Sequence, residues 1–407
     1  MRILQINSVA NSGSTGRIAE DIGSFFQNQG HESWIAFGRG NPQSSSQLIR
    51  IGSKLNKYWH GFWTLAFDRH GYAPEFATKN LVNAIERLRP DVILLHNIHG
   101  YYLNIDVLFN YLRTSGVPVL WTLFDCWAFT GHCSYFDDIS CEKWLTHCQL
   151  CPKKGNYPSS KFLDNSFRNF QDKKELFTTV PNLELICHSN WLANLVSKSF
   201  LSDLPTHVTP SAINLEVFKP THTEIREKYK IGNSILILGC ASIWSNRKGL
   251  SDFIALRKII PVDWKMVLIG LNESEISELP STILGLARTE SIKELAAWYS
   301  TSDVFVNPTS QDNFPTTNLE SLACGTPVVT YNTGGSPEAI DELTGKVVEK
   351  GNVEGLFFAI EELIALDKNV LAMNCRSRAE LLFDKNIRYG DYLSIINRML
   401  ERKMGNV

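Results

Sequence analysis

Short, nearly continuous apolar runs alternate with helical patterns along this chain, and the alternation occurs twice. In the first half the runs are residues 2–7, 31–38, 91–96, 118–125 and 183–189. In the second half they are residues 235–242, 265–270, 303–308, 327–332 and 345–350. A strand that is apolar along its whole length belongs to a parallel sheet buried on both faces, because a half-exposed strand would alternate. Each half therefore predicts a parallel sheet covered by helices.

The domain organisation follows from this repeat and from the length. A chain of 407 residues exceeds one ordinary domain. We expect an α/β protein with two Rossmann-like domains, residues 1–212 and 213–385, followed by a terminal helix over residues 386–407. The connection between the domains is expected near residues 211–224. Ligands of such sheets bind at the carboxyl ends of the strands, so a cleft faced by both domains is the expected site.

The composition excludes several classes of protein. Hydrophobic residues make up 43% of the chain, charged residues 20%, and the net charge is −2, which gives no electrostatic footprint for nucleic acid. No apolar run reaches the roughly 18 residues of a membrane span, and the start MRILQINS lacks the layout of a signal peptide. We therefore expect a cytoplasmic protein, in which nine cysteines do not form a disulfide framework.

A glycine-bearing loop follows the first predicted strand. It reads NSGSTGR, with Gly13, Ser14, Thr15 and Gly16 directly before a helical pattern. Glycines let the backbone approach a ligand closely, and a helix start offers N–H donors to an anion. The loop is either a phosphate contact or a tight strand-to-helix turn.

Two adjacent cations follow the first predicted strand of the second half. Arg247 and Lys248 precede a glycine at the expected start of a helix, where positive side chains oppose the helix dipole. They are either a solvated surface pair or the partners of an anion from outside the chain. A diphosphate bound by these cations needs no metal ion.

The stretch QDNFPTTNLESLACGTPVV (311–329) contains a helix start, because Thr316, Thr317 and Glu320 have the character of an N-terminal capping motif. Such a start either binds a phosphate or is the start of an ordinary capped helix. Its two carboxylates, Asp312 and Glu320, lie eight positions apart.

With the strand DVFVNPTS before it and the segment LACGTPVVTYNTGGSPE after its carboxylates, this stretch resembles a known signature. It is similar to the donor-binding region of retaining, nucleotide-sugar-dependent glycosyltransferases of the GT-B fold, called glycosyltransferase family four. That family has a Glu, seven residues, a second Glu, an Ala-x-Gly-x-Pro-Val strand and a Gly-Gly turn, here Gly334-Gly335. Within the family, TLFDCWAFTGHC resembles the branch that builds bacterial exopolysaccharide and colanic-acid-type capsules.

The resemblance implies a function for each part. Residues 1–212 would be the acceptor domain and residues 213–385 the donor domain, with the terminal helix 386–407 packing back on the first. The enzyme would be a hexosyltransferase that needs no metal for catalysis. Its donor is a nucleotide sugar of the UDP or GDP type, and its acceptor is a saccharide, free or lipid-linked, in surface polysaccharide synthesis. A peripheral contact with the inner face of the membrane is compatible with this expectation.

The resemblance also implies roles for single residues. Glu320 would hold the ribose hydroxyls, Asp312 would face the donor sugar, and the Arg247 and Lys248 cations would bind the diphosphate. The donor would also be contacted by Gly13, Ser14, Thr15, Gly16, Asn313, Phe314, Pro315, Thr316 and Thr317. The nucleotide oxygens would take the acceptor proton, so that no protein nucleophile is required.

Two positions depart from the family pattern. Asp312 stands where the family has its first Glu. Phe124 stands where the family has the histidine of Thr-x-His-Asp, next to Asp125. Phenylalanine neither donates nor accepts a hydrogen bond, so catalysis tolerates the absence of the histidine, or His99 or His132 fills the space, or activity is impaired. The expected catalytic residues are Asp312, Arg247, Lys248, Asp125 and His99.

A cysteine-rich insertion covers residues 126–151. Its last two cysteines form a C-x-x-C pair followed by proline, which is a common half of a zinc site. Cys133, Cys141, Cys148 and Cys151 are the expected ligands of a structural zinc, with His132 or His147 as alternates. Free thiols and a redox role are the alternatives. The remaining cysteines of the apolar patterns, Cys187, Cys240, Cys324 and Cys375, are expected in the core.

Two other functions compete with a glycosyltransferase. A nucleotide-sugar 2-epimerase of the same fold would isomerise its substrate without any acceptor. A non-catalytic, zinc-dependent scaffold protein, favoured by the cysteines and by Phe124, would turn over no nucleotide sugar.

Overall fold

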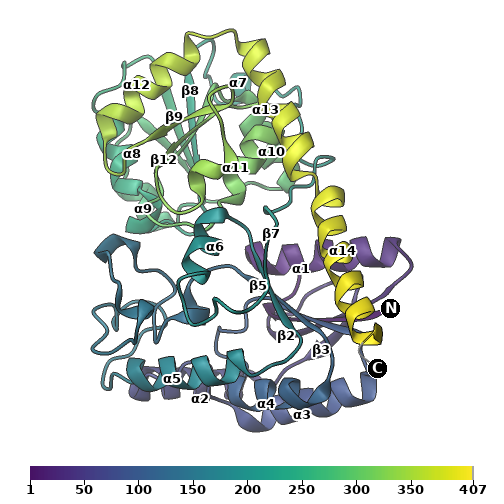
Figure 1. Cartoon of the computed structure of the whole chain (residues 1–407). Helices are drawn as coiled ribbons and strands as arrows, with labels where there is room; N and C mark the ends of the chain where they lie inside the picture. The colour runs from purple at the N-terminus through teal and green to yellow at the C-terminus, as the bar shows by residue number, and fades with distance from the viewer. Residues whose placement is uncertain (406–407) are drawn as a thin grey trace. The chain divides into compact units, whose positions relative to one another are not determined.

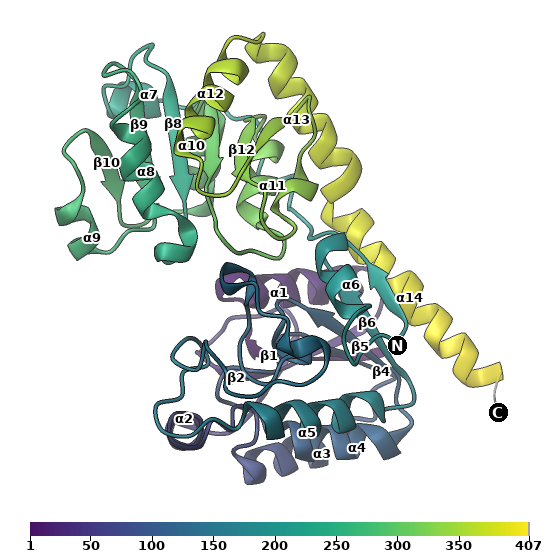
Figure 2. The ribbon, with the colours of Figure 1, turned by 60° about the vertical axis from the view of Figure 1, so that its left-hand side comes forward.

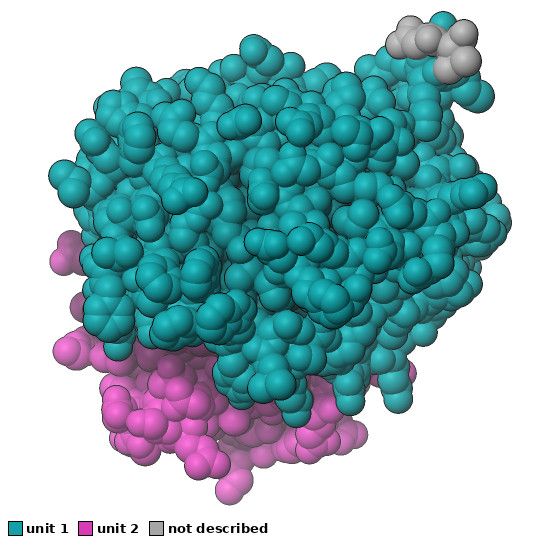
Figure 3. Space-filling view, turned by 90° about the horizontal axis from the view of Figure 1, so that it is seen from below, with its two compact units in different colours: residues 1–209, 389–407 teal, residues 210–388 magenta. Residues whose placement is uncertain are grey.

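The computed structural model describes residues 1–405 and divides the chain into two compact units (Figures 1 and 3). Unit 1 comprises Met1–Thr209 together with the C-terminal residues from Tyr389 on, and unit 2 comprises Pro210–Arg388. Each unit contains one sheet in which every strand pair is parallel. The prediction of two Rossmann-like α/β domains is confirmed.

The sheet of unit 1 has seven strands in the order β3-β2-β1-β4-β5-β6-β7. These are β1 (Arg2–Val9), β2 (Glu32–Arg39), β3 (Gln47–Arg50), β4 (Val92–Leu95), β5 (Val119–Leu123), β6 (Leu183–Cys187) and β7 (Thr206–Val208). The order reverses between β1 and β4, so loops that follow these two strands diverge and leave room for a ligand.

Helices cover both faces of this sheet. They are α1 (Gly13–Asn28), α2 (Lys54–Phe67), α3 (Glu75–Leu88), α4 (Ile105–Ser115), α5 (Ser166–Thr178) and α6 (Asn190–Val196). Helices α3, α4 and α5 lie side by side on one face, and α1 lies on the other (Figures 1 and 2). Between α4, β5 and α5 the rings of Phe109, Trp121 and Phe177 meet at centroid distances of 4.5 to 5.7 Å. Their burial explains why strand β5 is apolar throughout.

The terminal helix α14 (Lys385–Gly405) joins unit 1 from Tyr389 onward. Tyr389 packs edge-on against Phe25 of α1, and the Tyr392 hydroxyl lies 3.1 Å from the Thr122 hydroxyl. Arg402 forms an ion pair with Glu184 of β6. The C-terminal helix thus closes the sheet face that α1 leaves open.

The sheet of unit 2 has six strands in the order β10-β9-β8-β11-β12-β13. They are β8 (Leu236–Cys240), β9 (Lys265–Ile269), β10 (Ile283–Leu286), β11 (Val304–Asn307), β12 (Val328–Tyr331) and β13 (Gly345–Val348). Its helices are α7 (Ile225–Lys228), α8 (Leu250–Arg257), α9 (Glu273–Glu278), α10 (Ile292–Thr301), α11 (Thr316–Ala323), α12 (Val353–Ile364) and α13 (Lys368–Phe383). Helices α8 and α12 pack on one face of the sheet, and α10, α11 and α13 on the other (Figure 2). Here the order reverses between β8 and β11.

The apolar runs did not indicate the strands β3, β7 and β10. All three are edge strands, and most of their residues are exposed or half-buried. A strand with one solvated face and one open edge needs no continuous apolar run.

Residues 211–224, where we expected the connection, pack within unit 2. Ile213, Leu215 and Phe218 are buried in its core, and the Ile213 N–H donates to the Phe383 carbonyl at 2.8 Å. The chain passes between the units at residues 209/210 and 388/389. The irregular spacing of these three apolar side chains concealed their burial.

Candidate functional site

Three loops meet at the carboxyl end of the unit 2 sheet, where the strand order reverses. They follow β8, β11 and β12. The Arg247 carbonyl accepts hydrogen bonds from the Ser310 N–H at 2.8 Å and from the Thr309 hydroxyl at 3.2 Å. The Thr333 hydroxyl donates to the Thr309 carbonyl at 2.7 Å. These bonds join residues distant in sequence into one surface.

Two glycines make this close packing feasible. A Cβ at Gly249, whose φ is +74°, would lie 2.4 Å from the Pro308 carbonyl oxygen. A Cβ at Gly334, whose φ is +55°, would lie 1.8 Å from the Asp312 carbonyl oxygen. Only glycine tolerates both the positive φ and the missing space. The Gly-Gly turn after β12 therefore supports the backbone of Asp312.

The predicted charged residues form one group in the structure. The Asp312 carboxylate lies 2.6 Å from the Lys248 ammonium and 3.7 Å from the Arg247 guanidinium. Burial raises the pKa of Asp312, but the Lys248 and Arg247 charges outweigh it and leave the pKa below its usual value. One carboxylate faces two cations, so the group has an excess of positive charge.

Arg247 and Lys248 lie in a 3-10 turn (Asn246–Lys248), and α8 begins at Leu250. The Arg247 guanidinium also donates to the Gln311 carbonyl. Its side chain is 36% exposed and that of Lys248 is 20% exposed. The cations are therefore held in place at the surface rather than freely solvated, which favours the anion-binding alternative.

Helix α11 begins at Thr316, the first of the two threonines that mark the predicted helix start. Its N-cap is Pro315, and Thr316 and Thr317 are its first helical residues rather than its caps. The predicted helix start is therefore confirmed, although no side chain caps it, because Pro315 already sets the extended backbone that precedes the helix. The start of α11 directly follows Asp312, Asn313 and Phe314 and brings its positive dipole end to the charged group.

Glu320 lies one turn into α11, where its carboxylate accepts a hydrogen bond of 2.9 Å from the Tyr299 hydroxyl of α10. Burial and the Glu320 charge raise the pKa of Tyr299 well above its usual value. Sequence reasoning missed Tyr299, since a tyrosine in an apolar helical pattern carries no sign of its partner.

In unit 1 the loop after β1 continues directly into α1, which begins at Gly13 with φ +62°. The Asn11 N–H donates to the Gly16 carbonyl at 3.0 Å, and a Cβ at Gly16 would lie 2.9 Å from Val9 Cγ2. Gly13, Ser14, Thr15 and Gly16 thus form the first turn of the helix. This geometry is a tight turn, and its contact with a phosphate stays a prediction.

The loops after β4 and β5 bring two predicted residues together. His99 Nε2 lies 3.0 Å from an Asp125 carboxylate oxygen, and His99 Nδ1 lies 3.0 Å from the Tyr157 hydroxyl. The other Asp125 oxygen accepts the Trp127 N–H at 2.9 Å. Burial raises the pKa of Asp125, but His99 and the Trp127 N–H leave it below its usual value.

The structure distinguishes the two histidines that we considered near Phe124. His99 contacts Asp125, whereas His132 bonds to Asp68 instead. The Phe124 ring packs beside the rings of His96 and His188, at 6.2 and 5.2 Å. Sequence reasoning missed Tyr157, which follows the cysteine-rich insertion and has no motif of its own.

The four predicted metal-ligating cysteines, Cys133, Cys141, Cys148 and Cys151, all line one small cavity of unit 1. As their side chains stand, no three His, Cys, Asp or Glu residues within positions 1–405 have an arrangement that holds a metal ion. His147 packs on the Phe167 ring, away from this cavity. Cys187, Cys324 and Cys375 are buried and Cys240 is partly buried, near their expected core positions.

Comparisons with known proteins agree with the fold and with a glycosyltransferase activity. Residues 233–366 match the family model described as glycosyl transferases group 1. The chain is 24% identical over 374 residues to a protein of Escherichia coli named as the colanic acid biosynthesis glycosyl transferase WcaC, covering 87% of this chain and 88% of that one. It is 28% identical over 208 residues to the capsular polysaccharide biosynthesis glycosyltransferase CapM of Staphylococcus aureus, which is 48% of this chain and 55% of that one.

Solved structures show the same fold. Sucrose-phosphate synthase from Thermosynechococcus elongatus has a TM-score of 0.71 at 16% identity, covering 98% of this chain and 99% of that one. The Anabaena protein HepE in complex with UDP has a TM-score of 0.68 at 14% identity, covering 98% and 100%. The chain is a glycosyltransferase with the GT-B fold, and its residues 233–366 form a domain of the glycosyl transferases group 1 type.

Proposed function

We propose that this enzyme is a retaining hexosyltransferase that moves a sugar from a UDP- or GDP-sugar to a saccharide acceptor in bacterial surface polysaccharide synthesis. The observation that carries the proposal is the group of Asp312, Lys248 and Arg247 at the strand reversal of unit 2. The relatives in colanic acid and capsule synthesis support the pathway class.

The donor site is built from charges and a helix start. The diphosphate would take the Lys248 ammonium and the Arg247 guanidinium as partners, with the start of α11 adding its dipole. Asp312 fixes the Lys248 ammonium in advance, so that little reorganisation accompanies binding. Glu320, held by Tyr299, would accept the ribose hydroxyls.

Transfer then rests on position and charge. The same cations stabilise the negative charge that develops on the leaving diphosphate, and they do so without a metal ion. An oxygen of the leaving diphosphate would accept the proton of the attacking acceptor hydroxyl while both stay on one face of the sugar. In unit 1 we assign the polar role of the missing histidine to His99, which Asp125 and Tyr157 hold from both sides.

The acceptor side has a feature suited to a lipid carrier. Helix α2 exposes Leu55, Tyr58, Trp59 and Phe62, and the exposed Lys54 and Lys57 lie among them. Aromatic rings interleaved with lysines favour the interface of an anionic bilayer. No helix among residues 1–405 has the length and apolar character to cross a membrane. A relative from Escherichia coli, 24% identical over half of this chain, is named as acting on a diphosphoundecaprenol-linked sugar.

We therefore propose that α2 docks on the cytoplasmic membrane face, where the enzyme would reach a lipid-linked saccharide.

The overall function is tested by thermal-shift screening against UDP-, GDP- and ADP-sugars, since a bound donor stabilises the folded chain by mass action. Stabilisation by one class of donor supports the proposal. Unchanged melting with every donor, together with the absence of sugar release, contradicts it.

Substitutions of the two carboxylates, Glu320 and Asp312, should have different effects on binding and transfer. Glu320→Ala should weaken the binding of the nucleoside diphosphate by about 2 kcal/mol, because a contact with the ribose is lost. Asp312→Ala should leave that affinity intact or raise it, since Lys248 loses its internal partner, while transfer falls on the order of 100-fold because the sugar is misaligned. Asp312→Glu should retain more activity than Asp312→Ala. Calorimetry beside transfer assays decides this, and unchanged diphosphate binding in Glu320→Ala refutes the ribose role.

The Gly-Gly turn should be essential to the donor site. In Gly334→Ala the new Cβ collides with the Asp312 backbone, so the loop must shift and diphosphate affinity should fall by roughly tenfold or more. Gly351→Ala is the matched control, because Gly351 also has a positive φ, +80°, but has open space around its Cβ position. It should lose stability by about 1 kcal/mol with unchanged affinity. Equal affinities of the two variants would contradict the supporting role of the turn.

Membrane docking should depend on the exposed face of α2. The double change Trp59→Ser and Phe62→Ser should lower binding to vesicles that contain anionic lipid by roughly tenfold, because two interfacial rings are lost. Phe358→Ser is the control, since Phe358 of α12 is 58% exposed, close to the 54% of Phe62. Co-sedimentation measures the bound fraction. If the double variant binds vesicles as well as the parent does, α2 is not the docking surface.

A further inference from the structure

The cysteine-rich insertion surrounds a cavity whose volume suits a single ion. The cavity measures about 20 Å³, close to the space of one water molecule. Its lining includes Cys133, Cys141, Cys148, Cys151 and His132, and its remaining lining residues are Thr130, Phe136, Lys143, Trp144, Gln149 and Pro152. Four thiols of nine in the chain thus face one small space.

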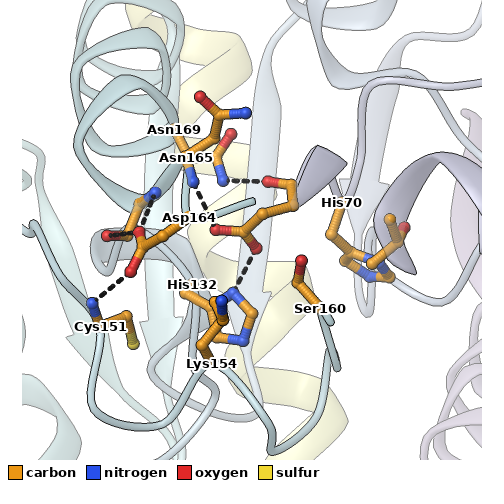
Figure 4. Close-up of polar contacts among 12 residues, drawn as sticks. His70, His132, Cys151, Lys154, Ser160, Asp164, Asn165 and Asn169 are labelled. Carbon is orange, nitrogen blue, oxygen red and sulfur yellow. Dashed lines mark hydrogen bonds and ion pairs between the residues drawn. The ribbon is translucent and has the colours of Figure 1, made fainter. Parts of the chain in front are cut away.

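The backbone around the cavity is arranged to receive sulfur atoms. The Gly131 N–H donates to Cys148 Sγ at 3.2 Å, and a Cβ at Gly131 would lie 2.6 Å from the Cys148 Cβ. The thiols of Cys133 and Cys151 are hydrogen-bonded to each other. The Cys151 N–H donates to the Asp164 carboxylate at 2.6 Å (Figure 4).

The surroundings of His132 give a second indication of a bound ion. It is 2% exposed, its Nδ1 bonds to Asp68, and its Nε2 is buried without a hydrogen-bond partner (Figure 4). His132 also belongs to the lining of the thiol cavity, and a carboxylate that holds an imidazole through one nitrogen fixes its tautomer and orientation. An unpartnered buried nitrogen is otherwise costly.

The charges nearby balance a negatively charged centre. Lys173 is buried, donates to the Trp127 and Thr130 carbonyls at 2.8 and 3.0 Å, and lies 3.4 Å from the centre of the Trp127 ring. Lys143, in the cavity lining, donates to the Gln149 and Leu150 carbonyls. Four thiolates around a divalent ion leave a charge of about −2, which the Lys143 ammonium in the lining would partly offset.

We propose that the insertion binds one structural Zn²⁺ through the thiolates of Cys133, Cys141, Cys148 and Cys151, with His132 as a hydrogen-bond donor to the cluster. The side chains must rearrange to bring the four sulfurs to tetrahedral positions, because no three such ligands among residues 1–405 stand in a metal-binding arrangement. The chain from Thr130 to Asn165, which contains all four cysteines, permits this rearrangement, because its only regular elements are two 3-10 turns, Asp137–Ile139 and Lys143–Leu145. A long irregular segment of this kind is typically held by a clamp.

The ion would also act on the candidate active site. Tyr157 follows Cys151 by six positions and holds His99 through its hydroxyl. Fixing the insertion therefore fixes the Tyr157–His99–Asp125 chain. Zinc would position these residues without touching the substrate.

Metal analysis of the full chain, purified without chelator from zinc-supplemented medium, tests the proposal. We expect close to one zinc per chain, and a fall to below about one tenth in Cys148→Ser and Cys151→Ser. Cys126→Ser is the matched control, because Cys126 is buried in the same insertion but does not line the cavity, and it should keep its zinc. Zinc-free parent protein, or equal zinc in all variants, overturns the site.

A second measurement covers variants that fail to fold. Replacing the metal of the parent chain with Co²⁺ should give the absorption of a tetrahedral ion with thiolate-to-cobalt charge transfer. Chelation should speed amide hydrogen exchange in residues 130–165 and leave unit 2 unchanged. Octahedral cobalt spectra, or a disulfide between Cys133 and Cys151 in non-reduced protein, would contradict four-thiolate zinc.

Discussion

The ion pair between Asp312 and Lys248 is the contact that holds together the loops of the proposed donor site. It joins the loop after β11 to the loop after β8, across the point where the strand order of unit 2 reverses. A charged pair that is mostly removed from water contributes stability only when its geometry is good and its hydrogen bonds are satisfied. Here Gly334 and Gly249 supply that geometry by letting neighbouring backbones approach. The pair therefore positions a cation for a ligand at least as much as it stabilises the fold.

Each unit gathers polar residues at the carboxyl end of its own sheet. Unit 2 gathers cations, a helix start and Glu320 at one end of its sheet, which suits a nucleotide diphosphate. Unit 1 gathers His99, Asp125 and Tyr157 at the corresponding end of its own sheet. Phe124 packs with His96 and His188 in place of the family's histidine. The loop after the neighbouring strand β4 therefore contributes the imidazole that contacts Asp125. The Tyr157 hydroxyl, six positions after the last cysteine of the insertion, holds the other nitrogen of that imidazole.

The sequence predicts the fold well wherever a strand is buried on both faces, as β1, β5 and β8 are. It fails for β3, β7 and β10, because an exposed edge imposes no apolar pattern. The site residues of the donor loops were predictable as single candidates. Their pairing was not, since Lys248 and Asp312 are 64 residues apart and meet only because β8 and β11 are neighbours. Tyr299, Tyr157 and Asp68 carry no motif, so their contacts with Glu320, His99 and His132 required the structure.

Calorimetric binding of UDP and GDP, beside uridine and guanosine, to Lys248→Gln tests most directly whether the pair serves a diphosphate. Lys368→Gln is the control, because Lys368 pairs with Asp303, which precedes the same strand β11 at its other end. We predict that Lys248→Gln lowers the affinity for the preferred diphosphate by roughly tenfold or more, because a charged hydrogen bond is lost. The affinity for the nucleoside should stay unchanged. Lys368→Gln should change neither. Diphosphate binding to Lys248→Gln as tight as to the parent, with only the stability of the chain reduced, would show that the pair is structural and that the diphosphate binds elsewhere.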